Sequence, residues 1–117
     1  MPRILLIEDD QNVRMLMEHV LLHENYQVET ADTVERSKQL IETGRYDLIV
    51  ADGRLPDGTG MMLADQAKQR GVPALIVTGY AFELMNADLG RFDFLLKPVR
   101  PDELLQAVER ALVGEPP

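Results

Sequence analysis

The sequence predicts a doubly wound α/β fold, in which helices cover both faces of a parallel sheet. Its 117 residues contain short apolar runs that lack the alternation of a half-exposed strand. Such runs are typical of strands buried on both faces. Stretches with helical spacing of apolar residues lie between them. The two kinds of segment alternate five times, and right-handed crossovers turn such a chain into a doubly wound sheet.

Five segments are expected to form the strands. Four are the apolar runs Ile4–Ile7, Leu48–Ala51, Ala74–Val77 and Phe92–Leu96, each too short for a helix. The fifth, Gln27–Thr30, has a lower apolar content. We therefore place it at an edge of the sheet, where less of its surface would be buried.

Five segments are expected to form helices: Gln11–Glu24, Thr33–Glu42, Gly60–Arg70, Ala81–Leu89 and Pro101–Val113. One face of the first carries apolar residues that should pack on the sheet, namely Val13, Leu16, Met17, Val20 and Leu21. The last begins with proline and two acids, a typical helix start. The fourth contains polar residues and is expected to be brief.

Composition and charge narrow the functional classes. The length fits one domain over 1–117, with 114–117 as a tail or the start of a linker. The absence of cysteine excludes disulfides and thiolate metal sites. A net charge of −8 disfavours direct binding to nucleic acid. The first apolar run is too short for a signal peptide or membrane span, so we expect a cytoplasmic protein without membrane contact.

Polar side chains follow four of the predicted strands. They are Glu8, Asp9 and Asp10 after the first strand, Asp52 after the third, Thr78 after the fourth and Lys97 after the fifth. In doubly wound folds, the ligand crevice lies beyond the carboxyl ends of the strands. We therefore expect several carboxylates, one hydroxyl and one ammonium to share a crevice.

This crevice would combine metal binding with phosphoryl transfer. Gathered carboxylates repel each other unless a cation joins them. Mg²⁺ prefers oxygen ligands and would suit two carboxylates and a backbone carbonyl. Asp52 could then form an acyl phosphate, because metal and ammonium neutralise the incoming oxygens. Lys97 and Thr78 would each bind a phosphoryl oxygen.

Four motifs follow one another along the chain. They are Ile7-Glu8-Asp9-Asp10; Asp52 followed by Leu55-Pro56-Asp57-Gly58 and Gly60; Thr78-Gly79-Tyr80; and Phe94-Leu95-Leu96-Lys97-Pro98. Together they resemble the response-regulator receiver domains of two-component signalling, over essentially the whole chain. The resemblance implies a flavodoxin-like fold, with about five helices around a five-stranded parallel sheet in the order 2-1-3-4-5.

By position, the resemblance implies an acceptor and a metal site. Asp52 matches the phosphoacceptor of the family. Glu8 and Asp9 match its acidic metal pair, with Asp9 as the direct ligand. Arg54 stands where the family lends a backbone carbonyl to the metal. The implied cofactor is Mg²⁺, held by Glu8, Asp9, Asp52 and the Arg54 carbonyl.

The resemblance also implies residues that sense the phosphoryl group. Thr78 and Lys97 match the family's phosphate-binding hydroxyl and ammonium, and Thr78 and Phe94 match its switch positions. A cis peptide bond is implied between Lys97 and Pro98. Arg54 and Tyr80 carry bulky side chains at positions that flank the phosphoryl site. We therefore expect a phosphorylated state that is not especially short-lived.

The implied function is that of a signalling phosphoacceptor rather than an enzyme. Its partners would be a sensor histidine kinase or histidine phosphotransfer protein and a downstream protein target. Three alternatives remain open: an aspartyl-nucleophile phosphatase of the haloacid-dehalogenase type, a flavin or nucleotide binder, and a receiver that binds a partner without phosphorylation. The phosphatase motif has a second Asp where Arg54 stands here. His19 and His23 have the spacing of zinc ligands but are expected to be solvated, and Asp57-Gly58 to form a turn.

Overall fold

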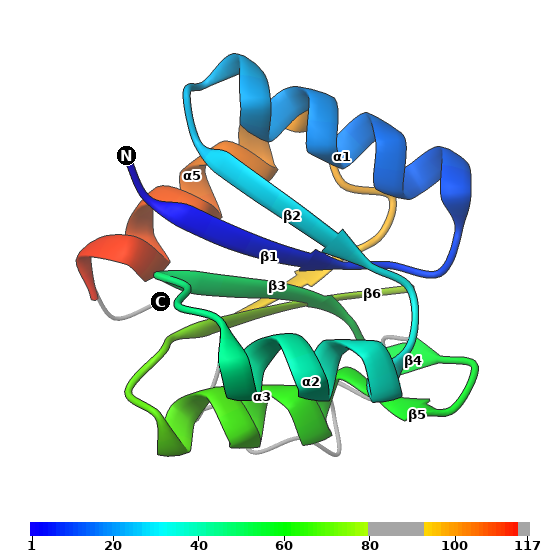
Figure 1. Cartoon of the computed structure of the whole chain (residues 1–117). Coiled ribbons are helices and arrows are strands. Elements are labelled where there is room, and N and C mark those ends of the chain that lie inside the picture. The colour runs from blue at the N-terminus through cyan, green and yellow to red at the C-terminus, as the bar shows by residue number, and fades with distance from the viewer. Residues whose placement is uncertain (80–92, 115–117) are drawn as a thin grey trace.

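The computed structural model describes residues 1–79 and 93–114. Within them, strands and helices alternate in the predicted order (Figure 1). The main elements are β1 (Arg3–Ile7), α1 (Gln11–His23), β2 (Gln27–Ala31), α2 (Val34–Thr43), β3 (Leu48–Asp52), α3 (Gly60–Gln69), β6 (Ala74–Thr78), β7 (Asp93–Leu96) and α5 (Pro101–Val113). The helix expected over 81–89 lies outside the described residues. None of the described helices is long and apolar enough to cross a membrane.

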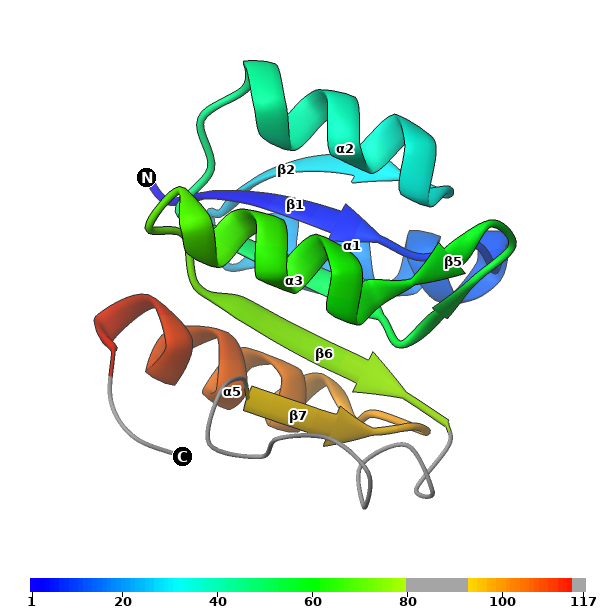
Figure 2. The ribbon, with the colours of Figure 1, turned by 90° about the horizontal axis from the view of Figure 1, so that it is seen from below.

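The five long strands form one parallel sheet in the order β2-β1-β3-β6-β7. Counting only these strands along the chain, this is the predicted order 2-1-3-4-5. The strand of low apolar content, β2, lies at an edge as expected. Because the strands run in the same direction, their carboxyl ends share one edge of the sheet (Figure 2).

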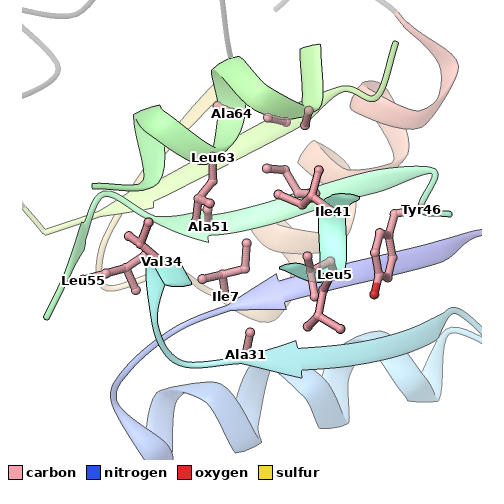
Figure 3. Close-up of a cluster of buried hydrophobic side chains, with 14 of the residues drawn as sticks. Leu5, Ile7, Ala31, Val34, Ile41, Tyr46, Ala51, Leu55, Leu63 and Ala64 are labelled. Carbon is pink, nitrogen blue, oxygen red and sulfur yellow. The ribbon is translucent and has the colours of Figure 1, made fainter. Parts of the chain in front are cut away.

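Helices cover both faces of the sheet, α1 and α5 on one side and α2 and α3 on the other (Figure 1). Along β1, Leu5 and Ile7 pack on the α2 and α3 side, whereas Ile4 and Leu6 pack on the other. All four are fully buried. Alternate residues of a strand point to opposite faces, so two covered faces require the unbroken apolar run seen in the sequence. Figure 3 shows the core on the α2 and α3 side.

The helices next to the carboxyl edge begin with side-chain caps. Asp10, Thr33 and Thr59 precede α1, α2 and α3, and each accepts a backbone N–H from the first turn of its helix. The cap of α5 is different, because Pro101 occupies the start of the helix and Arg100 before it makes no side-chain cap. These caps fix where three helices leave the edge that carries the polar residues.

One residue of the predicted apolar face of α1 is exposed. Leu16 is 58% exposed, whereas Met17 and Leu21 are buried. Each residue turns an α-helix by about 100°. The buried arc is centred on Met17 and Leu21, so a step back to Leu16 carries its side chain to the solvent side. The expectation that Leu16 packs on the sheet was therefore wrong.

Candidate functional site

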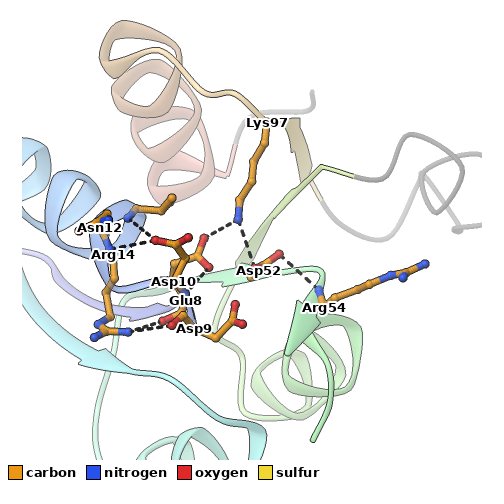
Figure 4. A network of polar contacts seen from close by, with 9 residues as sticks. Glu8, Asp9, Asp10, Asn12, Arg14, Asp52, Arg54 and Lys97 are labelled. Atoms are coloured by element: carbon orange, nitrogen blue, oxygen red, sulfur yellow. Dashed lines mark hydrogen bonds and ion pairs between the residues drawn. The ribbon is translucent and has the colours of Figure 1, made fainter. Parts of the chain in front are cut away.

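A cleft of about 660 Å³ opens at the carboxyl edge of the sheet. Polar residues from three strand ends line it: Glu8, Asp9 and Asp10 from the loop after β1, Asp52 from β3 and Lys97 from the loop after β7 (Figure 4). Asp52 is the last residue of its strand and so is held by the sheet itself. The structure therefore brings together the acids and the amine that the sequence placed at separate strand ends.

Three carboxylates meet in this cleft. Glu8, Asp9 and Asp52 each offer an oxygen, and these oxygens lie within 4.8 Å of one another. Glu8 is 2% and Asp52 8% exposed, whereas Asp9 is open to solvent. Carboxylates gathered this closely repel one another unless a cation joins them. The cleft therefore favours a cation.

Lys97 bridges two of these acids. Its Nζ donates to Glu8 Oε1 at 2.5 Å and to Asp52 Oδ2 at 3.2 Å. Burial opposes the charge of the ammonium, but the hydrogen bonds and attraction of Glu8 and Asp52 outweigh it and raise the pKa of Lys97. Lys97 is therefore a cation at neutral pH, and it lies within hydrogen-bond reach of the candidate phosphoacceptor. The Lys97-Pro98 peptide bond is cis, as expected.

Glu8 is the acid whose ionisation the cleft disturbs most clearly. Burial raises the pKa of Glu8 from 4.5 to about 7; the hydrogen bond from Lys97 acts in the opposite direction, and Asp52 adds to the rise. A carboxyl with this pKa takes up or releases its proton near neutral pH. A bound cation would favour the ionised form and lower the pKa again.

The loop after β1 is held by hydrogen bonds around Glu8. The backbone N–H of Asp10 donates to Glu8 Oε2 at 3.2 Å. Arg14, one turn into α1, donates from Nη1 to the backbone carbonyl of Glu8 at 2.8 Å. Sequence reasoning missed Arg14. Its only signal was a basic residue in the first turn of a helix that follows an acidic loop, since basic residues are favoured at the other end of a helix.

The loop after β3 packs against the back of Asp52. The N–H of Arg54 donates to Asp52 Oδ1 at 3.3 Å, and Arg54 lines the cleft. A Cβ added at Gly60 would lie 2.1 Å from the backbone oxygen of Asp52. Only glycine permits this close approach, so α3 can begin directly behind the end of β3. This loop forms a hairpin of β4 (Arg54–Leu55) and β5 (Gly58–Thr59), and the expected turn at Asp57 joins the two strands.

Two predicted residues lie farther from the cleft surface. Thr78 is the last residue of β6 and is 1% exposed; its carbonyl accepts the N–H of Lys97 at 2.8 Å, and Gly79 rather than Thr78 lines the cleft. Phe94 is half-buried in β7 and packs against the core on the α2 and α3 side. Thr78 is thus next to the loop after β7 that carries Lys97, here called the lysine loop, and Phe94 lies on β7, the strand that leads into this loop. Tyr80 lies outside the described residues.

The donor set of the cleft fits a magnesium ion. Glu8, Asp9 and Asp52 offer hard carboxylate oxygens close together, and Arg54 lines the same cleft. Mg²⁺ takes oxygen ligands and is often held by one or two carboxylates together with waters and phosphate oxygens. Because Asp9 is exposed, an ion there could keep several waters.

The fold and the sequence are similar to those of known proteins. The response regulator receiver domain family matches residues 4–109, and the chain belongs to this family. The chain is 31% identical over 120 residues to the response regulator ArlR of Staphylococcus aureus, covering 99% of this chain. Receiver domains are the phosphoacceptor modules of two-component signalling. The chain spans about half the length of the curated relatives it matches, 55% in the case of ArlR.

Solved structures agree with this assignment. The chain resembles a CheY-like response regulator receiver domain protein from Methanospirillum hungatei with a TM-score of 0.86 and 30% identity, over 97% of this chain and 95% of that one. It also resembles the response regulator TrrA of Thermotoga maritima, solved in complex with Mg²⁺ and BeF. That match has a TM-score of 0.86 and 26% identity, over 95% of this chain and 99% of that one.

Proposed function

We propose that Asp52 accepts a phosphoryl group from a phosphohistidine donor in a Mg²⁺-dependent reaction, and that the domain then changes its protein contacts. The observation that carries this proposal is the position of Lys97 Nζ, 3.2 Å from Asp52 Oδ2 in a cleft that holds two further acids. A cation beside a buried carboxylate at the metal-binding edge suits an acceptor that must stay ionised while a negative group approaches.

The transfer is a displacement at phosphorus. A carboxylate oxygen of Asp52 forms the new O–P bond as the P–N bond to the donor imidazole breaks, and the imidazole nitrogen keeps the electron pair and takes up a proton. Mg²⁺, bound by Asp9, Asp52 and the Arg54 carbonyl beside Glu8, would supply charge neutralisation to the phosphoryl oxygens. Lys97 would neutralise another of these oxygens, drawing its Nζ away from Glu8.

The response of the domain would start at Lys97. Its backbone N–H is bonded to the carbonyl of Thr78, so movement of the lysine loop toward a phosphoryl group bears on the end of β6. Thr78 would turn its hydroxyl to the phosphoryl group. The side chain of Phe94, in the neighbouring strand, would change position in response and so alter the protein surface. We propose a sensor histidine kinase or histidine phosphotransfer protein as donor and a protein as downstream target, all in the cytoplasm. The chain would assist only its own phosphorylation and dephosphorylation.

Acetyl phosphate tests the acceptor directly. Incubation with acetyl phosphate and Mg²⁺, followed by intact mass measurement, should show the gain of one phosphoryl group in the wild type and none in Asp52→Ala. Asp47→Asn is the matched control, since Asp47 precedes the same strand at the opposite edge of the sheet. No mass gain in the wild type, while it still binds Mg²⁺, would favour a receiver that binds its partner without phosphorylation.

Mg²⁺ binding can be tested by its effect on unfolding. At about tenfold excess over its dissociation constant, Mg²⁺ should stabilise the folded wild type by about 1.4 kcal/mol. Asp9→Asn should lose most of this stabilisation. Retention of the full effect in Asp9→Asn would remove Asp9 from the set of metal ligands.

A further inference from the structure

The side chain of Asp57 joins two parts of the chain that no strand pairing connects. Asp57 lies in the turn of the β4–β5 hairpin and contacts the start of α2. Figure 1 shows the hairpin beside this end of α2. Its Oδ1 accepts the backbone N–H of Val34 at 2.7 Å, and its Oδ2 accepts that of Glu35 at 3.0 Å. Both oxygens of one carboxylate thus hold the first two residues of a helix that precedes them by more than twenty positions.

This contact completes the start of α2. The first four backbone N–H groups of a helix have no partner within it. The side-chain hydroxyl of Thr33, the residue just before the helix, accepts the N–H of Arg36. The carboxylate of Asp57 accepts the N–H groups of Val34 and Glu35, the two helix residues before Arg36. The two N–H bonds hold the pKa of Asp57 below its usual value, so the carboxylate is charged at neutral pH and favours the positive end of the helix dipole.

Apolar packing brings the hairpin to the same place. Leu55 of β4 and Val34 of α2 are both buried in the core on the α2 and α3 side and lie side by side in Figure 3. A Cβ added at Gly58 would lie 3.0 Å from Val34 Cγ2, so the hairpin backbone runs close to the helix start. The hairpin and α2 are therefore already packed closely, and the hydrogen bonds of the Asp57 carboxylate fix the position of the hairpin relative to the start of α2.

The hairpin in turn carries a part of the cleft. Arg54 pairs with Thr59 across the hairpin. The N–H of Arg54 donates to Asp52 Oδ1, and its carbonyl is the backbone ligand in the proposed metal site. Asp57 lies three positions after Arg54. A shift of the turn toward or away from α2 would therefore move the Arg54 peptide relative to Asp52.

We propose that Asp57 is a positioning residue for the Mg²⁺ site, which it holds in shape by clamping the β4–β5 hairpin to the start of α2. The inference rests on the proposed function, because it concerns the ligands Asp52 and Arg54. It also has a reciprocal consequence. If the Asp57 contact strengthens Mg²⁺ binding, Mg²⁺ binding must strengthen the Asp57 contact with the first turn of α2. The free energy of coupling is the same in both directions.

Titration calorimetry with MgCl₂ compares the wild type with Asp57→Ala, Asp57→Asn and Thr33→Ala. Thr33→Ala is the matched control, because it also removes a cap from α2 but leaves the hairpin attached. Asp57→Ala should raise the Kd for Mg²⁺ roughly 10-fold, the size of effect seen when residues that hold metal ligands in place are replaced. Asp57→Asn retains one acceptor oxygen and should fall between. Thr33→Ala should bind like the wild type, although both alanine variants destabilise α2.

Hydrogen exchange of the backbone amides, measured by NMR, supplies a test that does not depend on metal. Without Mg²⁺, Asp57→Ala should speed exchange at Arg54, whereas Thr33→Ala should leave Arg54 unchanged. Adding Mg²⁺ should slow exchange at Val34 and Glu35 in the wild type but not in Asp57→Ala.

The two hypotheses fail in different ways. A wild type that binds no Mg²⁺ refutes the proposed function and this inference with it. A wild type that binds Mg²⁺ normally, with equal Kd values for Asp57→Ala and Thr33→Ala, refutes only the role of Asp57. Unfolding of Asp57→Ala would be visible as loss of amide dispersion. In that case Asp57→Asn is the deciding variant. If its Kd for Mg²⁺ equals that of the wild type, and its amide exchange is faster only in α2, the inference is overturned.

Discussion

Replacing Glu8 by Gln should make the metal-free protein more stable at alkaline pH. Glu8 is 2% exposed, and its burial raises its pKa from 4.5 to about 7. Gln has nearly the same shape and cannot ionise. The substitution therefore removes a charge that the fold itself disfavours, while Asp52 remains to pair with Lys97.

The sign and size of the effect follow from the two pKa values. Because the folded pKa is raised above the unfolded value, the protonated carboxyl contributes stability that is fully present below about pH 4.5. That contribution is lost as the pH rises to about 7. At about 1.4 kcal/mol per pH unit, the total loss is about 3 kcal/mol. Between pH 5 and pH 8 the wild type should lose about 2 kcal/mol relative to Glu8→Gln.

Urea unfolding followed by far-UV circular dichroism measures this difference, since the chain has no tryptophan. Curves are compared at pH 5 and pH 8, in EDTA and in excess Mg²⁺. Glu109→Gln is the control, because it makes the same chemical change at an exposed position of α5 outside the cleft. Mg²⁺ favours the ionised form of Glu8 and should narrow the gap between wild type and Glu8→Gln at pH 8.

A parallel change in the stabilities of Glu8→Gln and wild type in EDTA from pH 5 to pH 8 would contradict this prediction. That result would mean that Glu8 ionises in the folded protein as easily as in the unfolded chain. A destabilised Glu8→Gln at pH 8 would be a stronger contradiction. It would show that the ion pair with Lys97 outweighs the burial of the carboxylate.

Three further substitutions test other parts of the structure. Gly60→Ala places a Cβ 2.1 Å from the Asp52 carbonyl oxygen unless the backbone moves. It should lower the free energy of unfolding in urea by about 1–3 kcal/mol. It should also slow phosphorylation, measured by intact mass. Lys97→Met should accept a phosphoryl group roughly 100-fold more slowly yet bind Mg²⁺ more tightly by calorimetry, because an ammonium beside the carboxylates no longer repels the ion. Leu63→Ala, at a fully buried position of α3, should cost about 2–5 kcal/mol in urea unfolding and leave the calorimetric Kd for Mg²⁺ unchanged.

The fold could be predicted because two periodicities in the sequence agree with it. Runs such as Ile4–Ile7 and Ala74–Val77 are apolar at every position, which only a sheet covered on both faces requires. The convergence of Glu8, Asp52 and Lys97 followed from the same argument, because parallel strands bring their carboxyl ends to one edge. These predictions rest on local patterns combined with one rule of topology.

What the sequence could not supply depends on the orientation of one element against another. Arg14 reaches the Glu8 carbonyl only because of the angle at which α1 leaves the loop. Leu16 carries the same apolar signal as Met17, and only the packed helix separates the exposed residue from the buried one. Asp57 was correctly predicted to lie in a turn, yet nothing near it in the sequence indicates that its partners are the first amides of α2.

The contact between Lys97 and Glu8 joins residues that are 89 positions apart. A chain emerging from the ribosome therefore has no complete cleft until Lys97 has been made, and a fragment that ends before Lys97 would lack the amine of the cleft. Uptake of phosphate from a small-molecule donor thus doubles as an assay of complete folding. Material in which β1 and the loop after β7 do not meet would not be phosphorylated, so signalling would draw only on molecules whose receiver fold is complete.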